Sequence, residues 1–124
     1  WYPGTGAHNE TGNAKGEGST MNRPMPAGSG LKELGPFFSE DFMEAMEEFK
    51  PDLVLISAGF DSRLGDPLGH FRLTDENFTE LTKVLLDVAY KYSDGRLVSM
   101  LEGGYNIDGL GDAVESHVSQ LIKV

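Results

Sequence analysis

Apolar positions in the second half of the chain predict two strands joined by a helix. Residues 53–56 are continuously apolar, which predicts a strand buried on both faces. From about 75 to 92, apolar side chains recur at helical spacing, and Thr74 precedes them as a candidate cap. The segment "RLVSML", 96–101, predicts a second buried strand. A connecting helix of this length favours parallel strands, and hence an open α/β sheet with helices on its faces.

Two further helices are predicted on either side of this unit. The first runs from about Ser39 to Phe49, with Ser39 as its cap, and ends before Pro51. The last runs from about Leu110 to Lys123 and places its apolar residues on one face. Together with the strands, these helices place all regular structure in residues 37–124.

Residues 1–36 are rich in glycine and are predicted to form a loop. Within them, "STMNRPM" could hold a short strand, which Pro24 would confine to a strand end or a sheet edge. A loop of this length in a compact domain is usually functional or disordered. We therefore expect one domain, 1–124, with a glycine-rich loop region before its helices and strands.

Composition excludes several classes of function. The net charge is −10, so no basic patch is available for phosphates, and nucleic-acid binding is disfavoured. An acidic surface could suit a cationic substrate, or it could serve only solubility. No apolar run approaches the roughly 18 residues of a membrane span. The absence of cysteine excludes disulfides and cysteine-ligated zinc, and it is compatible with the cytoplasm, the compartment we expect.

Two polar side chains follow the predicted strands at corresponding positions. The turn "AGFD" delivers Asp61 after the first strand, and "EGGY" delivers Tyr105 after the second. Ligands of open parallel sheets bind beyond the carboxyl ends of the strands, so these two side chains are predicted to share a site.

Each of these residues has more than one interpretation. Asp61 could ligate a metal, act as a general base, or bond its own loop in an Asx-turn. Tyr105 could donate to a developing oxyanion, or it could be a half-buried tyrosine of the core. Asp66, in "GDPLG", is typical of an ordinary turn.

The histidines offer no metal-binding pattern. His8 lies in the first loop and is expected to be solvated, while His70 could reach the strand-end face. His117 falls at the edge of the apolar face of the last helix, so a structural role is expected. A catalytic zinc normally has three protein ligands, and this sequence offers one convincing candidate, Asp61.

Several segments together resemble a known family. They are "YPGTG", "ETGNAKGEGSTMNRPMPAGSG", "PDLVLISAGFDSRLGDPLGHFRLT" and "GRLVSMLEGGYN", which occur in the family's order and cover essentially the whole chain. They are similar to zinc-dependent histone deacetylases, in the class II and acetylpolyamine amidohydrolase branch. The combination of "SAGFD", "GDPLG" and "LEGGYN" is the specific part of this resemblance.

The resemblance implies an arginase/deacetylase-like three-layer α/β fold with a mostly parallel sheet. It implies hydrolysis of an acetylated amine, either acetyl-lysine or an acetylpolyamine, with zinc as the cofactor. By this resemblance Asp61 is a zinc ligand, and Tyr105 donates to the carbonyl oxygen as water attacks. The substrate tunnel would be formed by Tyr2, Leu68, Gly103 and Gly104.

The sequence departs from the family pattern in one respect. The family's Asp-x-His ligand pair and its tandem-histidine base lie upstream of "YPGTG", where this sequence begins. We therefore expect the C-terminal part of a deacetylase domain, which would be inactive and hold little zinc in isolation. A complementing N-terminal segment would restore the enzyme. The alternative is a non-catalytic remnant with a binding or structural role, which self-associates through an exposed parallel edge.

Overall fold

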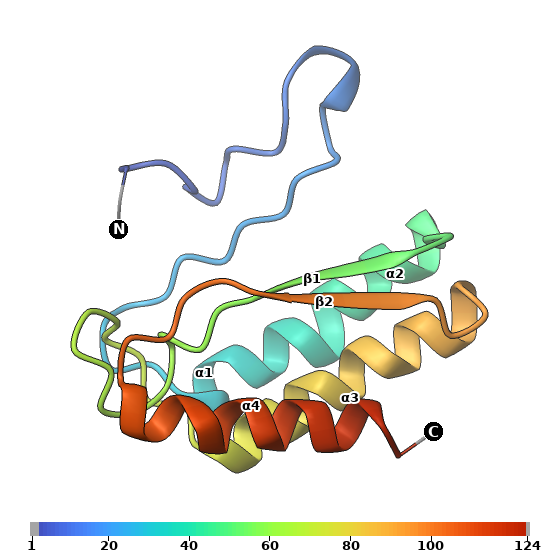
Figure 1. Ribbon diagram of the computed structural model, residues 1–124. Helices are drawn as coiled ribbons and strands as arrows, with labels where there is room; N and C mark the ends of the chain where they lie inside the picture. Colours follow the sequence, from blue (N-terminus) through green and yellow to red (C-terminus); the bar gives the residue numbers. More distant parts are fainter. Residues whose placement is uncertain (1–2, 124) are drawn as a thin grey trace.

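The computed structural model describes residues 3–123 and shows helices packed along one side of a two-stranded sheet (Figure 1). No helix within that range is long and apolar enough to cross a membrane. The elements are η1 (Ala14–Gly16), α1 (Leu31–Pro36), η2 (Phe37–Phe42), α2 (Met43–Phe49), β1 (Val54–Ala58), α3 (Asp75–Tyr92), β2 (Leu97–Leu101) and α4 (Ile107–Leu121).

The two strands are parallel and in direct contact, as the sequence predicts. Val54 pairs with Leu97 at one end and Ala58 with Leu101 at the other. Helix α3 makes the connection between them, and it begins at the predicted Thr74 cap, whose N–H donates to Asn77 Oδ1 at 3.1 Å. The predicted strand–helix–strand unit is therefore confirmed.

The last helix begins earlier than predicted. Helix α4 starts at Ile107 and not near Leu110, because Asn106 caps it by accepting a hydrogen bond from the Gly109 N–H at 3.1 Å. The glycines of its first turn, Gly109 and Gly111, obscure this start, since they weaken the helical pattern in the sequence.

The first helical region differs more from its prediction than the last helix does. It runs without interruption from Leu31 through α1, η2 and α2, so the predicted cap at Ser39 and the predicted loop over 31–36 are wrong. Its start is fixed by the Gly30 N–H, which donates to Glu33 Oε2 at 2.8 Å. Pro36 lies inside the helix and is followed at once by the wider π turn of η2, which accommodates its missing N–H.

Residues 3–30 form a loop apart from the single turn η1, and "STMNRPM" within them forms no strand. Figure 1 shows much of this loop standing away from the packed helices. Arg23 anchors it, since its guanidinium bonds the Asp41 carboxylate and lies 5.4 Å from the centre of the Phe37 ring. The loop therefore reaches η2 through one charged side chain.

The core lies between the sheet and its helices, around Phe60, Leu73, Phe78 and Ala113. The other face of the sheet is open. Leu55 is 61% exposed, and Val98 and Met100 are each 46% exposed. The prediction that the strands are buried on both faces is thus wrong, because the helices within residues 3–123 cover only one face of the sheet.

Candidate functional site

The two turns after the strands remain paired beyond the sheet. The Glu102 N–H donates to the Ala58 carbonyl at 3.0 Å, and the Phe60 N–H donates to the Gly103 carbonyl at 2.9 Å. These bonds continue the ladder into both turns. They place Asp61 of the first turn beside Gly103 of the second.

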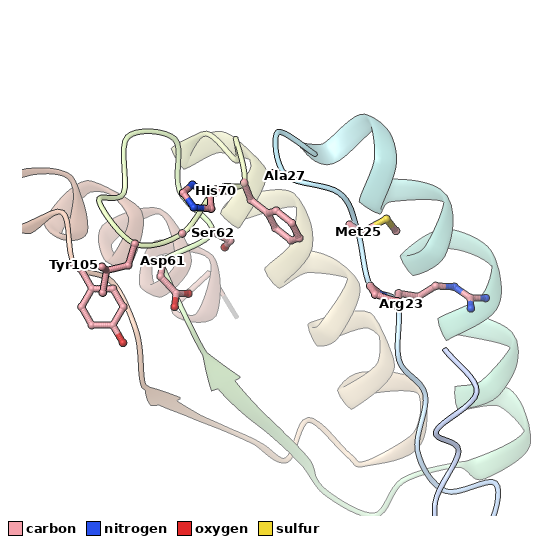
Figure 2. A pocket seen from close by; sticks show the side chains of 11 residues that line it. Arg23, Met25, Ala27, Asp61, Ser62, His70 and Tyr105 are labelled. Atoms are coloured by element: carbon pink, nitrogen blue, oxygen red, sulfur yellow. The ribbon is translucent and has the colours of Figure 1, made fainter. Parts of the chain in front are cut away.

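Asp61 and Tyr105 line one cavity of about 660 Å³ (Figure 2). The remaining walls come from the loop at 23–27 and from the turn at 68–71, which includes Leu68 and His70. The sequence predicted that the side chains after the two strands would share a site, and the geometry brings them together. Arg23, Met25 and Phe71 of the same cavity were missed, because nothing local in the sequence indicates that the first loop folds back here.

The Asp61 carboxylate lies against glycine backbone. A Cβ atom on Gly103 would be 2.5 Å from Asp61 Oδ2, and one on Gly59 would be 3.0 Å from Oδ1. No hydrogen bond to this carboxylate is found within residues 3–123, so the Asx-turn interpretation of Asp61 has no support. The half-buried carboxylate has no donor among these described residues and lies at the surface of the cavity.

Gly104 serves the turn in a different way. Its φ is +137°, which L side chains rarely adopt, and a Cβ there would be 2.6 Å from Leu110 Cδ1. This glycine lets the chain pass close to α4 and directs Tyr105 toward the cavity. Leu68, one of the four residues expected in the tunnel, lines the cavity, whereas Tyr2, another of them, lies outside the residues described.

Asp66 links the two turns beside the cavity, a contact that the sequence did not predict. Its Oδ1 accepts hydrogen bonds from the N–H groups of Leu68 and Gly69, each at 2.8 Å. Its Oδ2 accepts from Tyr105 at 2.8 Å and from Asn106 at 3.3 Å. Partial desolvation acts to raise the pKa of Asp66, but these four backbone donors outweigh it and hold the pKa below its usual value.

Arg63 fastens the loop after β1 to two helices. Its guanidinium makes two hydrogen bonds to the Asp75 carboxylate at the start of α3, at 2.7 and 2.9 Å. It also lies 3.9 Å from Asp112 and packs against Gly109, both in α4. Arg63 therefore fixes the loop that carries Asp61 against α3 and α4.

The three histidines occupy different environments. His117 is buried, with Nδ1 2.7 Å from Thr82 Oγ1 and Nε2 2.8 Å from Ser99 Oγ, which supports the structural role expected for it. Burial lowers the pKa of His117. His8 is exposed and bonded to Arg23, and His70 lines the cavity near Asp61.

The residues described do not form a complete metal centre by themselves. No group of three or more histidine, cysteine, aspartate or glutamate side chains in 3–123 is placed to hold a metal ion. The Asp61 carboxylate fits as one oxygen ligand of zinc, which accepts aspartate alongside histidine.

Comparisons with known proteins identify the family. Residues 1–121 match the model of the histone deacetylase domain. The chain is 39% identical over 121 residues to "Histone deacetylase 14, chloroplastic" of Arabidopsis thaliana, covering 98% of this chain and 29% of that protein.

Two solved structures are also similar. The HDA15 HD domain superposes with a TM-score of 0.90 at 36% identity, over 98% of this chain and 33% of that one. An acetylpolyamine aminohydrolase from Burkholderia pseudomallei gives a TM-score of 0.82 at 28% identity, over 98% of this chain and 34% of that one. The chain thus spans about a third of these relatives, within the arginase/deacetylase-like α/β fold that was expected. It belongs to the histone deacetylase family.

Proposed function

We propose that this chain forms part of the active site of a zinc-dependent amidohydrolase, which removes acetyl groups from acetylated amines. The observation that carries the proposal is the convergence of Asp61 and Tyr105 on one cavity at the carboxyl ends of parallel strands. Family membership supports the reaction class. Acetyl-lysine and an acetylpolyamine are both candidate substrates, because relatives of both kinds are similar to this chain.

In this proposal Asp61 is a zinc ligand. The bound metal would polarise the acetyl carbonyl and lower the pKa of the attacking water. The glycines at 59 and 103 leave room for the carboxylate and keep it at the cavity surface. A catalytic zinc normally has three protein ligands, so the other two, and the general base, would come from residues outside 3–123.

Tyr105 is the proposed oxyanion donor. Its hydroxyl would donate a hydrogen bond to the carbonyl oxygen as negative charge develops there, an interaction that is strongest in the transition state. Leu68 and Tyr2 would form apolar walls for the methylene chain of the substrate, and Gly103 and Gly104 would shape the tunnel floor. Such walls exclude water and hold a flexible substrate in a reactive position.

We propose a complementing N-terminal segment of the deacetylase domain as the partner that completes the site. The cytoplasm remains the proposed compartment, on the cysteine-free composition alone. The rival proposal is a non-catalytic remnant that self-associates and has a binding or structural role. The open face of the sheet favours that rival for the isolated chain.

Deacetylation assays test the proposal. In the complete catalytic domain containing this sequence, Asp61→Ala and Tyr105→Phe should each abolish most acetate release from an acetyl-lysine peptide or an acetylpolyamine. Tyr90→Phe is the matched control, because Tyr90 and Tyr105 are both 50% exposed but Tyr90 lies on α3, away from the cavity. Full activity of Tyr105→Phe would overturn the proposed role of its hydroxyl.

The isolated chain provides a second test. It should release no acetate and should bind well under one zinc per chain, because it offers one candidate ligand. Metal analysis after dialysis measures this directly. A near-stoichiometric zinc content, lost in Asp61→Ala, would show that the isolated chain completes the site, contrary to the proposal.

A further inference from the structure

One carboxylate joins the two turns that face the cavity. Asp66 belongs to the turn after β1, and its Oδ2 accepts hydrogen bonds from the backbone N–H groups of Tyr105 and Asn106 in the turn after β2. Its Oδ1 accepts from Leu68 and Gly69 in its own turn. Asp66 thus ties the cavity wall at Leu68 to the backbone of Tyr105.

The chemistry of this contact requires an ionised carboxylate. All four partners are N–H donors, so both oxygens must accept, and each accepts two bonds. An amide of the same size has one accepting oxygen, and its NH₂ group would face two N–H donors. Asparagine at position 66 could therefore hold one turn and not both.

Within the described residues, Gly103 is bonded to Phe60 and Asn106 caps α4, but neither of these bonds is made by Tyr105 itself. Its side chain is 50% exposed, so packing does not hold the ring in place. The Asn106 side chain donates to the Gly65 carbonyl at 3.0 Å, a neutral bond between the same two turns. The charge-assisted bonds of Asp66 are stronger than such a neutral bond.

We propose that Asp66 is a positioning residue, which holds the backbone of Tyr105 so that its hydroxyl is aimed into the cavity. This inference rests on the proposed function of Tyr105 and deepens it. Asp66 is not expected to touch the substrate or the metal. It acts through Tyr105, because a donor displaced by about 1 Å loses much of its effect on a transition state.

Kinetics of the complete, zinc-loaded catalytic domain test the proposal. Asp66→Asn should lower kcat about 10- to 100-fold. In a Tyr105→Phe background, Asp66→Asn should lower kcat no further, because the hydroxyl that Asp66 positions is already absent. Multiplicative losses in the double variant would overturn the inference, since they would show that Asp66 acts independently of Tyr105.

Asp94→Asn is the matched control. It also removes a carboxylate from a loop contact, that of Arg96, but it lies before β2, at the end of the sheet away from the turn of Tyr105. It should leave kcat close to the wild-type value. An unchanged kcat in Asp66→Asn, alongside a strong loss in Tyr105→Phe, would reject the inference and leave the proposed function intact. A wild-type rate in Tyr105→Phe would instead reject the proposed function.

A readout without catalysis completes the test. In the metal-free domain, amide hydrogen exchange of the segment 103–106 should be faster in Asp66→Asn than in the wild type, and unchanged in Asp94→Asn. Equal exchange in all three proteins would overturn the inference. Should Asp66→Asn not fold, Asp66→Glu keeps both acceptors and the charge but displaces the turns by a methylene. A folded Asp66→Glu variant with wild-type kcat would likewise overturn it.

Discussion

At the scale of single residues, the adjacent glycines 103 and 104 are required for different reasons. Gly103 leaves room for the Asp61 carboxylate, whereas Gly104 adopts a positive φ close to Leu110 and Phe60. The first requirement concerns the site and the second concerns the fold. Alanine substitutions separate the two.

Gly104→Ala should destabilise the fold. Both the positive φ and the 2.6 Å approach to Leu110 oppose a Cβ, so a loss of about 1–3 kcal/mol in the free energy of unfolding is expected. Urea unfolding followed by circular dichroism measures it. An unchanged midpoint would show that the turn relaxes without cost.

Gly103→Ala should spare stability and impair the site. The atom it meets, Asp61 Oδ2, is the end of a side chain that can rotate away, so the free energy of unfolding should change less than in Gly104→Ala. The displaced carboxylate should lower deacetylation by the complete domain. Normal turnover in Gly103→Ala would argue against Asp61 as a ligand at this place.

His117 should make stability depend on pH. Thr82 Oγ1 donates to the Phe78 carbonyl, so His117 Nδ1 must donate to Thr82. In the neutral ring, Nε2 then accepts from Ser99 Oγ. Burial lowers the pKa of His117 in the folded state, so the unfolded chain binds the proton more readily. Stability should therefore fall as the pH drops below the unfolded-state value of about 6.5.

The measurement is the free energy of unfolding between neutral and mildly acidic pH. His117→Gln removes this titration, so its stability should be lower at neutral pH but should fall less steeply with acid than that of the wild type. His8 and His70 remain in both proteins and provide the common baseline. Identical slopes would contradict the expected shift.

The sequence predicts those site residues whose position follows from chain direction. Asp61 and Tyr105 each follow a strand closely, so a parallel pairing alone brings them to one edge of the sheet. Asp66 could not be found in this way, because its Oδ2 partners are 39 and 40 positions away. The sequence around Asp66 predicts a turn, and this prediction is correct, but it gives no indication of the long-range contact.

At the scale of elements, hydrophobic periodicity predicts those helices that bury one apolar face. Helix α3 has a clear apolar face and a capping residue, and its predicted bounds are confirmed. The start of the first helix is missed, because Gly35 and Pro36 are residues that normally end helices. The π turn that follows Pro36 depends on packing and leaves no comparable signal in the sequence.

The contact of Arg63 is the main polar link between elements around the site. It joins the loop after β1 to the first turn of α3, and the Asp75 carboxylate also interacts favourably with the positive end of that helix. Asp112 in α4 is a weaker partner at 3.9 Å and is mostly exposed. The link therefore depends chiefly on the paired bonds to Asp75.

Removing that link should cost measurable stability. Arg63→Ala should lower the free energy of unfolding by about 1–3 kcal/mol, since the ion pair is partly buried and doubly hydrogen-bonded. In a double-mutant cycle with Asp75→Asn, the two losses should be clearly less than additive. Additive losses would show that the pair contributes little and that the Arg63 side chain acts by packing.

At the scale of the whole molecule, the dominant feature is a sheet covered on one face only. Leu55, Val98 and Met100 form an apolar patch on the open face, and the register places Leu55 directly beside Val98. Parallel sheets are normally covered on both faces, so this patch calls for a partner surface. In solutions of the isolated chain, only a second copy is available to provide it.

The isolated chain should therefore self-associate through this face. Light scattering should give a mass above that of a monomer, and Leu55→Lys should move it toward the monomer, because a charge on the patch opposes burial.

Ile107→Lys is the matched control for this variant. Ile107 is an 85% exposed apolar residue on α4 and not on the sheet, so its substitution should leave the mass unchanged. A monomeric wild-type chain would refute the expectation. An equal effect of both variants would assign association to general surface hydrophobicity and not to the open face. If a complementing segment of the deacetylase domain covers the same patch, adding that segment should dissociate the wild-type oligomer. Leu55→Lys should then weaken binding of the segment to this chain.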